Sequence, residues 1–279
     1  MPSSPLTEAA TLGLIAGGGA LPAAILAALA AQGRPSFTVA ITGNCDPATV
    51  VNRPHVWRDI AAVGGILAAL RDAGCVEVLL AGRIGRPDFS ALLPDWQGIK
   101  LLPRVIKAAT RGDDSLIRTL VEYFEEQGFR IVGTGAVASA LVAPLGVLGA
   151  VHPSEADAAD IARAAAVVRA LGALDVGQAA VVRDGLVLGV EAAEGTDALL
   201  ARCATLNGPQ RGGVLLKAVK PGQERRVDLP TIGVATVQNA AAARLAGIAI
   251  HAGNALVLDR AALVAAANAA GMFVVGVEA

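Results

Sequence analysis

Short apolar runs alternate with turns and longer helix-like stretches along the first half of the chain. Apolar runs typical of buried strands occupy residues 11–16, 36–42, 76–81 and 129–133. Helix-like stretches occupy residues 22–32, 63–73 and 116–128. No turn in this half carries a hairpin signal, so the pattern predicts parallel strands joined by crossing helices. We therefore expect an α/β protein whose residues 1–133 form a Rossmann-like parallel-sheet domain.

The second half of the chain has a different order of elements. The apolar runs 178–182 and 186–191 are separated by Arg183-Asp184-Gly185, and Asp-Gly between such runs is a strong β-hairpin signal. The remaining predictions are helices at 155–171, at 234–243 and from Ala198 with Thr196 as N-cap, and strands from 214 and at 248–251, 255–258 and 273–277. This order predicts a mixed α/β domain at 152–279, joined to the first domain by a Gly-, Ala- and Pro-rich linker at 134–151. We expect the substrate to bind between the two domains.

Residues 214–233, VLLKAVKPGQERRVDLPTIG, combine an apolar, strand-like start with an unusual density of charge. The run breaks at Pro221-Gly222, and twelve residues hold the polar side chains Lys217, Lys220, Gln223, Glu224, Arg225, Arg226 and Asp228. Only 17% of the chain is charged, so the clustering is specific to this stretch. Cations that bind phosphate oxygens beside carboxylates that bind a metal or a water suit phosphoryl chemistry. The alternative is a solvated loop, but strand-like sequence on both sides would hold it rigidly.

A glycine turn, Gly17-Gly18-Gly19-Ala20, separates the first predicted strand from a helix that begins at Pro22. Backbone N–H groups at such a turn can bind an anion. A dinucleotide fingerprint fails because Pro22 stands where its last glycine would be, and no Walker lysine follows. Arg83 and Ile84 follow another predicted strand and should reach the same edge of the sheet. A tight βα turn and a surface arginine are the alternatives.

Three carboxylates, Glu191, Glu194 and Asp197, surround Gly195-Thr196 at a predicted strand-to-helix turn. This is more acid than helix capping needs, and the three could bind Mg²⁺ through oxygen. Asp113 and Asp114 also stand at a helix start, where capping is the simpler explanation. Asp46 before Pro47 is explained in the same way.

The composition narrows the possible functions. The net charge is −1, so the basic face of a nucleic-acid-binding protein is not expected. Three cysteines without metal-like spacing indicate buried thiols in a reducing compartment. Three histidines are too few for a dinuclear site built on several of them.

Two uncharged stretches, 12–32 and 131–151, are long enough to cross a membrane, but both contain glycine and proline. They fit strand-turn-helix units better. The first ten residues lack the basic region of a secretory signal and contain Glu8. We therefore expect a cytoplasmic protein.

Three motifs spread over most of the chain resemble those of one family: LGLIAGGGALP from residue 12, GQAAVVRDGLVLGVEAAEGTD from 177 and KPGQERRVDLPTIG from 220. Together they resemble the LpxI-type UDP-2,3-diacylglucosamine pyrophosphatases of the lipid A pathway. The resemblance implies Mg²⁺-dependent hydrolysis of UDP-2,3-diacylglucosamine to UMP and 2,3-diacylglucosamine 1-phosphate, lipid X. It also implies that Asp228 is catalytic. Glu224 departs from the family pattern, in which Asp follows K-P-x-Q.

The resemblance and the residue chemistry together assign roles. Asp228, with Glu191, Glu194 or Asp197, would hold the metal or orient the water, and Lys217, Lys220 and Arg226 would bind the diphosphate. The expected substrate contacts are Gly17, Gly18, Gly19, Ala20, Arg83, Ile84, Gln178, Gly195, Thr196, Gln223 and Thr231.

Two acyl chains need an apolar groove, expected in the second domain and open to the cytoplasmic face of the inner membrane, where the protein would bind peripherally. A homodimer is a further expectation. The rival functions are a nucleotide-binding regulatory protein, a sugar-nucleotide transferase or epimerase, and a scaffold.

Overall fold

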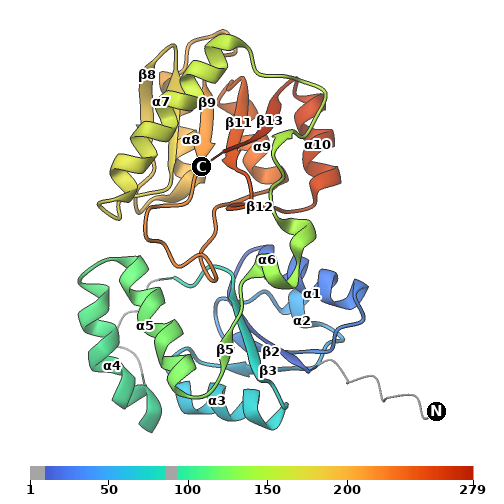
Figure 1. Cartoon of the computed structure of the whole chain (residues 1–279), viewed down its shortest axis with the longest axis vertical. Helices are drawn as coiled ribbons and strands as arrows, with labels where there is room; N and C mark the ends of the chain where they lie inside the picture. The colour runs from blue at the N-terminus through green and yellow to red at the C-terminus, as the bar shows by residue number, and fades with distance from the viewer. Residues whose placement is uncertain (1–9, 86–92, 279) are drawn as a thin grey trace, which may run out of the picture. The chain divides into compact units, whose positions relative to one another are not determined.

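The computed structural model describes residues 10–85 and 93–278, and the chain divides into two compact units, Met1–Ser139 and Ala140–Ala279. Each unit has its own sheet and its own helices (Figure 1). The boundary falls inside the segment 134–151 that we expected to link two domains. We describe the two units separately.

Unit 1 contains a five-stranded sheet in the order β3-β2-β1-β4-β5, and all its pairings are parallel. Its strands are β1 (Leu12–Ala16), β2 (Ser36–Ile41), β3 (His55–Arg58), β4 (Glu77–Ala81) and β5 (Arg130–Ile131). Every residue of β1 is buried, as expected for the central strand of a sheet covered on both faces. The predicted Rossmann-like parallel sheet is therefore confirmed.

The helices of unit 1 connect these parallel strands. They are α1 (Leu21–Ala31), α2 (Pro47–Val50), α3 (Val63–Asp72), α4 (Trp96–Ala109), α5 (Asp113–Glu126) and α6 (Thr134–Val137), followed by a 3₁₀ turn, η1 (Ser139–Leu141). Asp46 caps α2 by accepting a hydrogen bond from the N–H of Ala48 at 2.9 Å, which confirms its predicted role. Asp113 and Asp114 lie in the first turn of α5, where carboxylates favour a helix start.

Unit 2 contains a six-stranded mixed sheet in the order β6-β13-β11-β9-β7-β8. Its strands are β6 (Gly146–Val147), β7 (Ala179–Arg183), β8 (Leu186–Val190), β9 (Val214–Lys217), β11 (Gly247–His251) and β13 (Phe273–Val277). β9, β11 and β13 run parallel to one another. β6 pairs antiparallel with β13, and β7 pairs antiparallel with both β9 and β8. A separate parallel pair joins β10 (Thr231–Ile232) to β12 (Leu256–Val257). The mixed α/β domain is confirmed.

The hairpin between β7 and β8 turns at the predicted Asp-Gly pair. Asp184 and Gly185 have φ values of 51° and 77°, the left-handed conformation that a two-residue hairpin turn requires. Asp160, in the helix that precedes the hairpin, accepts hydrogen bonds from both turn N–H groups, at 2.9 and 2.7 Å.

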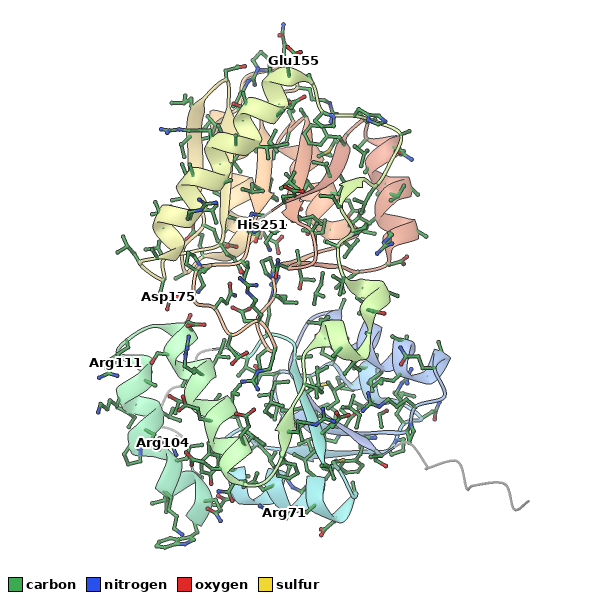
Figure 2. All side chains as sticks on the ribbon, in the orientation of Figure 1. Arg71, Arg104, Arg111, Glu155, Asp175 and His251 are labelled. Atoms are coloured by element: carbon green, nitrogen blue, oxygen red, sulfur yellow. The ribbon has the colours of Figure 1, made fainter. Side chains whose placement is uncertain are left out.

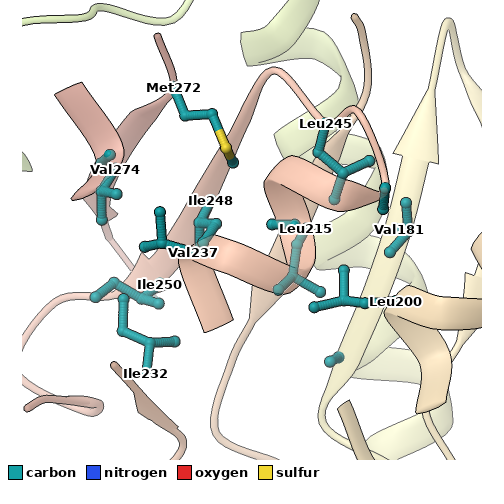
Figure 3. Packing of buried hydrophobic residues seen from close by; sticks show 14 of the residues in the cluster. Val181, Leu200, Leu215, Ile232, Val237, Leu245, Ile248, Ile250, Met272 and Val274 are labelled. Carbon is teal, nitrogen blue, oxygen red and sulfur yellow. The ribbon is translucent and has the colours of Figure 1, made fainter. Parts of the chain in front are cut away.

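Helices cover both faces of the unit 2 sheet. They are α7 (Glu155–Gly172), α8 (Gly195–Leu206), α9 (Val234–Ala242) and α10 (Arg260–Ala269). Leu215 of β9 joins the cluster that includes Leu200 of α8 and Val237 of α9 (Figure 3). Its neighbour Leu216 joins the cluster on the other face, with Val168 of α7. This alternation follows from the two-residue period of a strand.

One helix start differs from the prediction. Thr196 is not the N-cap of α8, because the helix begins at Gly195 and Glu194 holds the capping position. The hydroxyl of Thr196 donates instead to the carboxylate of Glu191. Gly195, at φ 79°, provides the left-handed turn at which the helix starts, three residues before the predicted start at Ala198.

Candidate active site

Lys217 is the last residue of β9 and lies at the carboxyl end of a central strand of the unit 2 sheet. It pairs in register with Ala179 of β7 and with Ile250 of β11. Its side chain is only 6% exposed, and its Nζ donates to the backbone carbonyl of Thr231 at 3.1 Å. A buried ammonium with a fixed partner ties the end of β9 to the start of β10. The loop 218–230 is therefore anchored at both ends.

Gln223 lies inside this loop and joins two parts of it to Gln178, the residue before β7. The side chain is 6% exposed, and its Oε1 accepts from the N–H of Lys220 at 2.8 Å. Its Nε2 donates to the Oδ2 of Asp228, and it approaches the Oε1 of Gln178 at 3.4 Å. The N–H of Asp228 donates to the carbonyl of Glu224 at 3.0 Å. The backbone and the carboxylate of Asp228 are thus both held by the loop itself.

Glu191 connects the same site to the hairpin and to α8. Its carboxylate is 7% exposed; Oε2 accepts from the N–H of Gln178 at 3.2 Å, and Oε1 accepts from Thr196. The backbone at Gly177 packs closely against the backbone of Glu191, since a Cβ on Gly177 would lie 2.0 Å from the carbonyl oxygen of Glu191. The residues form a connected series: Thr196, Glu191, Gln178, Gln223 and Asp228. All five were predicted site residues, and the structure brings them together.

Two of the predicted diphosphate-binding cations are held by carboxylates. The Nζ of Lys220 forms an ion pair with Asp175, just beyond α7 (Figure 2). The guanidinium of Arg226 donates to both oxygens of Glu224, at 2.9 and 2.8 Å. Lys220 and Arg226 lie on the loop that also carries Asp228, and these pairs hold the charged ends of their side chains. Glu224 therefore has an ion-pair partner, Arg226, on the same loop.

Asp175 was not predicted as a site residue. It is separated from Lys220 by 45 positions, and no local pattern links two residues so far apart. Its left-handed backbone, with φ 55°, turns the chain between α7 and β7. A lone aspartate two residues before the motif that begins at Gly177 was the available signal.

Glu194 and Asp197 make contacts elsewhere. Glu194 pairs with Arg202 at 2.8 Å, and hydrogen bonds from its own backbone N–H and from Arg202 lower its pKa. Asp197 accepts from the Nδ2 of Asn239 at 2.9 Å. Within residues 10–85 and 93–278, no group of three or more His, Cys, Asp or Glu side chains is placed to share a metal ion. The four predicted carboxylate ligands thus do not form one cluster.

The glycine turn of unit 1 packs against the turn after β4. Gly18 and Arg83 exchange two backbone hydrogen bonds, each 2.8 Å long. A Cβ on Gly17 would lie 2.6 Å from the carbonyl oxygen of Arg83, and one on Gly18 would lie 2.8 Å from that of Asn44. Close backbone packing therefore explains both glycines without a ligand.

The residues beside this turn face solvent. Gly19, Ala20, Arg83 and Ile84 are exposed, and the start of α1 has no side-chain cap. The structure thus brings the predicted unit 1 residues to one edge of the parallel sheet. Contact of this edge with a nucleotide stays a prediction.

His251 ends β11, one residue beyond the partner of Lys217. Its Nδ1 is buried and has no hydrogen-bond partner among the described residues. Burial, together with the positive charges of Arg169 and Arg225, lowers its pKa. No local pattern singles this histidine out, because only the pairing of β11 with β9 brings it next to the register partner of Lys217.

The burial of the three cysteines agrees with the prediction made from their spacing. Cys45, Cys75 and Cys203 are buried free thiols. No helix in the described part of the chain has the length and apolar character needed to cross a bilayer.

The fold and the site define a two-unit α/β protein with a polar, cation-rich loop at the carboxyl end of its second sheet. Family models for the LpxI N-terminal and C-terminal domains match residues 11–141 and 144–275. A relative from Caulobacter vibrioides, UDP-2,3-diacylglucosamine pyrophosphatase LpxI, is 50% identical over 273 residues, which cover 96% of this chain and 97% of the relative. The chain belongs to the LpxI family.

Proposed function

We propose that this protein hydrolyses the pyrophosphate bond of UDP-2,3-diacylglucosamine, releasing UMP and 2,3-diacylglucosamine 1-phosphate. The observation that carries the proposal is identity of 50% with a pyrophosphatase of that specificity over nearly the whole of both chains. The connected series from Thr196 to Asp228 supports it, because it holds a carboxylate in a fixed position on the loop that follows Lys217 and carries Lys220 and Arg226.

In this proposal Asp228 orients the attacking water and accepts its proton. The amide of Gln223 donates to Asp228 and fixes the direction of the carboxylate. A positioned general base of this kind contributes ~10²–10⁴-fold to a rate. The remaining members of the series act through Gln223, since Glu191 holds the backbone of Gln178.

Lys217, Lys220 and Arg226 would bind the diphosphate. Lys220 and Arg226 already have carboxylate partners, so the substrate phosphates would share or replace Asp175 and Glu224. Charged donors fixed before the reaction stabilise developing negative charge without reorganising. Gly17 to Ala20 and Arg83 remain proposed contacts for the nucleotide part of the substrate.

We also propose dependence on Mg²⁺, which Asp228 would hold through a water, because its carboxylate acts as the base. Mg²⁺ commonly uses one or two carboxylates with waters and substrate phosphates, so a site without three protein carboxylates fits this ion. When bound, the ion neutralises diphosphate charge and lowers the pKa of a water. Glu191 is less suited to the role, because both its oxygens accept hydrogen bonds from the protein.

The diacyl substrate implies peripheral contact with the cytoplasmic face of the inner membrane. Moving acyl chains into water costs ~0.8 kcal/mol per CH₂, so the enzyme must reach its substrate at the bilayer. The expected position of the substrate between two domains and the homodimer stay predictions. Sedimentation velocity tests whether the protein is a homodimer.

The test of the reaction is UMP release from purified UDP-2,3-diacylglucosamine with and without Mg²⁺. We expect UMP and lipid X in equal amounts with Mg²⁺ and loss of both with EDTA. A folded protein that releases no UMP would overturn the proposed reaction. UMP release that is unchanged by EDTA would overturn the metal dependence alone.

A further inference from the structure

Large apolar side chains are exposed to solvent in and just before α4. They are Leu93, Trp96, Ile99 and Ile106, with exposed fractions of 92%, 68%, 51% and 46%. These are four of the twelve exposed large hydrophobic side chains in the described residues, gathered in one short stretch. Such a gathering on a soluble unit indicates an interaction surface.

The exposed positions fall on one side of the helix. Trp96, Ile99, Pro103 and Ile106 are spaced by three or four residues, which places them along one stripe. The other side of α4 is buried, including Leu101 and Ala108. The helix is therefore held in unit 1 by one face and leaves a second apolar face outside.

Cations flank this stripe. Lys100 and Lys107 are exposed, and the Nζ of Lys100 lies 5.2 Å from the centroid of the Trp96 ring. We define the α4 face as Trp96, Ile99, Pro103 and Ile106 with Lys100 and Lys107. A tryptophan, aliphatic side chains and flanking lysines are the composition of helices that lie in the interface of a bilayer.

A polar hollow of about 180 Å³ opens beside the α4 face, between α4 and α5. It is lined by Arg104, Lys107, Ala108, Arg111, Ser115, Thr119 and Glu122. Figure 2 shows Arg104 and Arg111 on α4 and the turn after it. Arg104 pairs with Glu126 at 2.7 Å, whereas Lys107 and Arg111 have no carboxylate partner in the described part of the chain. Two cations and two hydroxyls beside an apolar stripe suit a phosphodiester headgroup.

We propose that the α4 face and this hollow dock unit 1 on a bilayer that contains anionic phospholipids. The apolar side chains enter the boundary between headgroups and acyl chains, and Lys100, Lys107 and Arg111 meet lipid phosphates. The proposal deepens the proposed function, on which it rests for the need to reach a diacyl substrate. It assigns the membrane contact to a helix of the first unit.

Charge complementarity favours a lipid surface over a second copy of this chain. In a symmetric dimer the α4 face would meet itself, bringing the lysines of both copies together. An anionic leaflet instead attracts each lysine near its surface. Its interfacial region also accepts the amphipathic tryptophan ring.

The experiment uses the full chain and vesicles that contain no UDP-linked lipid. In a Trp57→Phe background, Trp96 is the only tryptophan, because the sequence contains two. We expect a blue shift of its fluorescence and co-sedimentation with vesicles of phosphatidylglycerol and phosphatidylethanolamine. The protein should bind vesicles of phosphatidylcholine alone at least roughly tenfold more weakly. The variant Lys100→Glu/Lys107→Glu should show the same loss of affinity on anionic vesicles.

The matched variants compare exposed apolar residues on the two units. Trp96→Gln/Ile99→Gln/Ile106→Gln should lose co-sedimentation, while Leu186→Thr/Leu206→Gln, which removes side chains 67% and 56% exposed, should keep it. Far-UV circular dichroism verifies folding of each variant. Equal binding by the triple variant, or equal binding to neutral and anionic vesicles, would overturn the proposal. A sedimentation coefficient of the triple variant that differs from that of wild type without vesicles would also overturn it, because it would indicate that a second copy of the chain occupies the α4 face.

The failure of this proposal is separable from failure of the reaction. Hydrolysis of detergent-dispersed substrate should be the same in wild type and the triple variant, because no residue of the α4 face belongs to the proposed active site. Loss of hydrolysis in detergent by the triple variant would contradict a pure docking role.

Discussion

Gln223 connects the loop backbone, the hairpin and the proposed catalytic carboxylate. A buried amide must satisfy both its donor and its acceptor atoms. Gln223 does this with the N–H of Lys220, with Gln178 and with Asp228. The position of Asp228 therefore depends on residues that the chain supplies from two separate motifs.

At the same scale, the burial of His251 predicts a pH-dependent stability. The native state favours the neutral imidazole, because burial and two arginines lower its pKa. The unfolded chain binds the proton near its ordinary pKa of about 6.5. The free energy of unfolding should therefore fall as pH falls from about 6.5 through the native pKa.

The measurement is urea unfolding of wild type and His251→Asn at pH 7.5 and pH 5. Wild type should lose more stability between the two values than the variant does. His55→Asn, at an exposed position, controls for the loss of one histidine. Parallel losses in wild type and His251→Asn would contradict the account.

At the scale of elements, the helices and strands with a regular pattern of apolar and polar residues were predicted from the sequence. The strands around Leu14 and Val181 and the Asp-Gly hairpin were found because buried runs end at glycine or at a turn pair. The all-parallel order of unit 1 followed from the lack of hairpin signals. Regular periodicity and turn chemistry were sufficient for these elements.

Other elements were missed for physical reasons. α4 contains Gly98 and Pro103, and half of its large apolar residues face solvent, so its sequence lacks the expected pattern of a covered helix. β3 is a half-buried edge strand, and β10 has two residues. Their conformation depends on neighbours far along the chain.

The site was predictable as far as it is local. Gln223 and Asp228 come from one motif, and Glu191 with Thr196 comes from another. That the two motifs meet depends on the pairing of β7 with β9. The capping role expected for Thr196 was wrong, since Glu191 takes its hydroxyl. Asp175 was invisible to local patterns.

The hairpin provides a prediction at this scale. Asp160 is 4% exposed and accepts the N–H groups of Asp184 and Gly185. Hydrogen bonds to a charged group contribute about 1.5–3 kcal/mol each, so the loss of both in Asp160→Ala should lower the free energy of unfolding by roughly 3–6 kcal/mol. Asp160→Asn keeps one acceptor and should lose less. Urea unfolding at pH 7 that gave wild-type stability for Asp160→Ala would show that these bonds do not hold the turn.

At the scale of the whole molecule, each unit has the parts of an independent domain. Unit 2 has a six-stranded sheet with a buried apolar cluster on each face. Unit 1 has its own parallel sheet, in which β1 is wholly buried. The units therefore do not need each other to bury their cores.

We predict that residues 140–279 fold when expressed alone. The fragment should unfold cooperatively in urea, with a far-UV spectrum of mixed α/β structure, because its sheet is complete. A fragment that starts at Glu155 lacks β6 and should be less stable. Gradual, non-cooperative unfolding of the longer fragment would contradict the division into two folding units.

The central claim is that this family member hydrolyses its lipid nucleotide with Asp228. The most direct measurement is single-turnover UMP release by wild type, Asp228→Asn and the control Asp184→Asn, with enzyme in excess over substrate and saturating Mg²⁺. Asp184 is a suitable control because it lies at the exposed hairpin turn. We predict that Asp228→Asn lowers the rate by ~10²–10⁴-fold while Asp184→Asn does not change it. A rate for Asp228→Asn within a few-fold of wild type would show that another residue performs the chemistry.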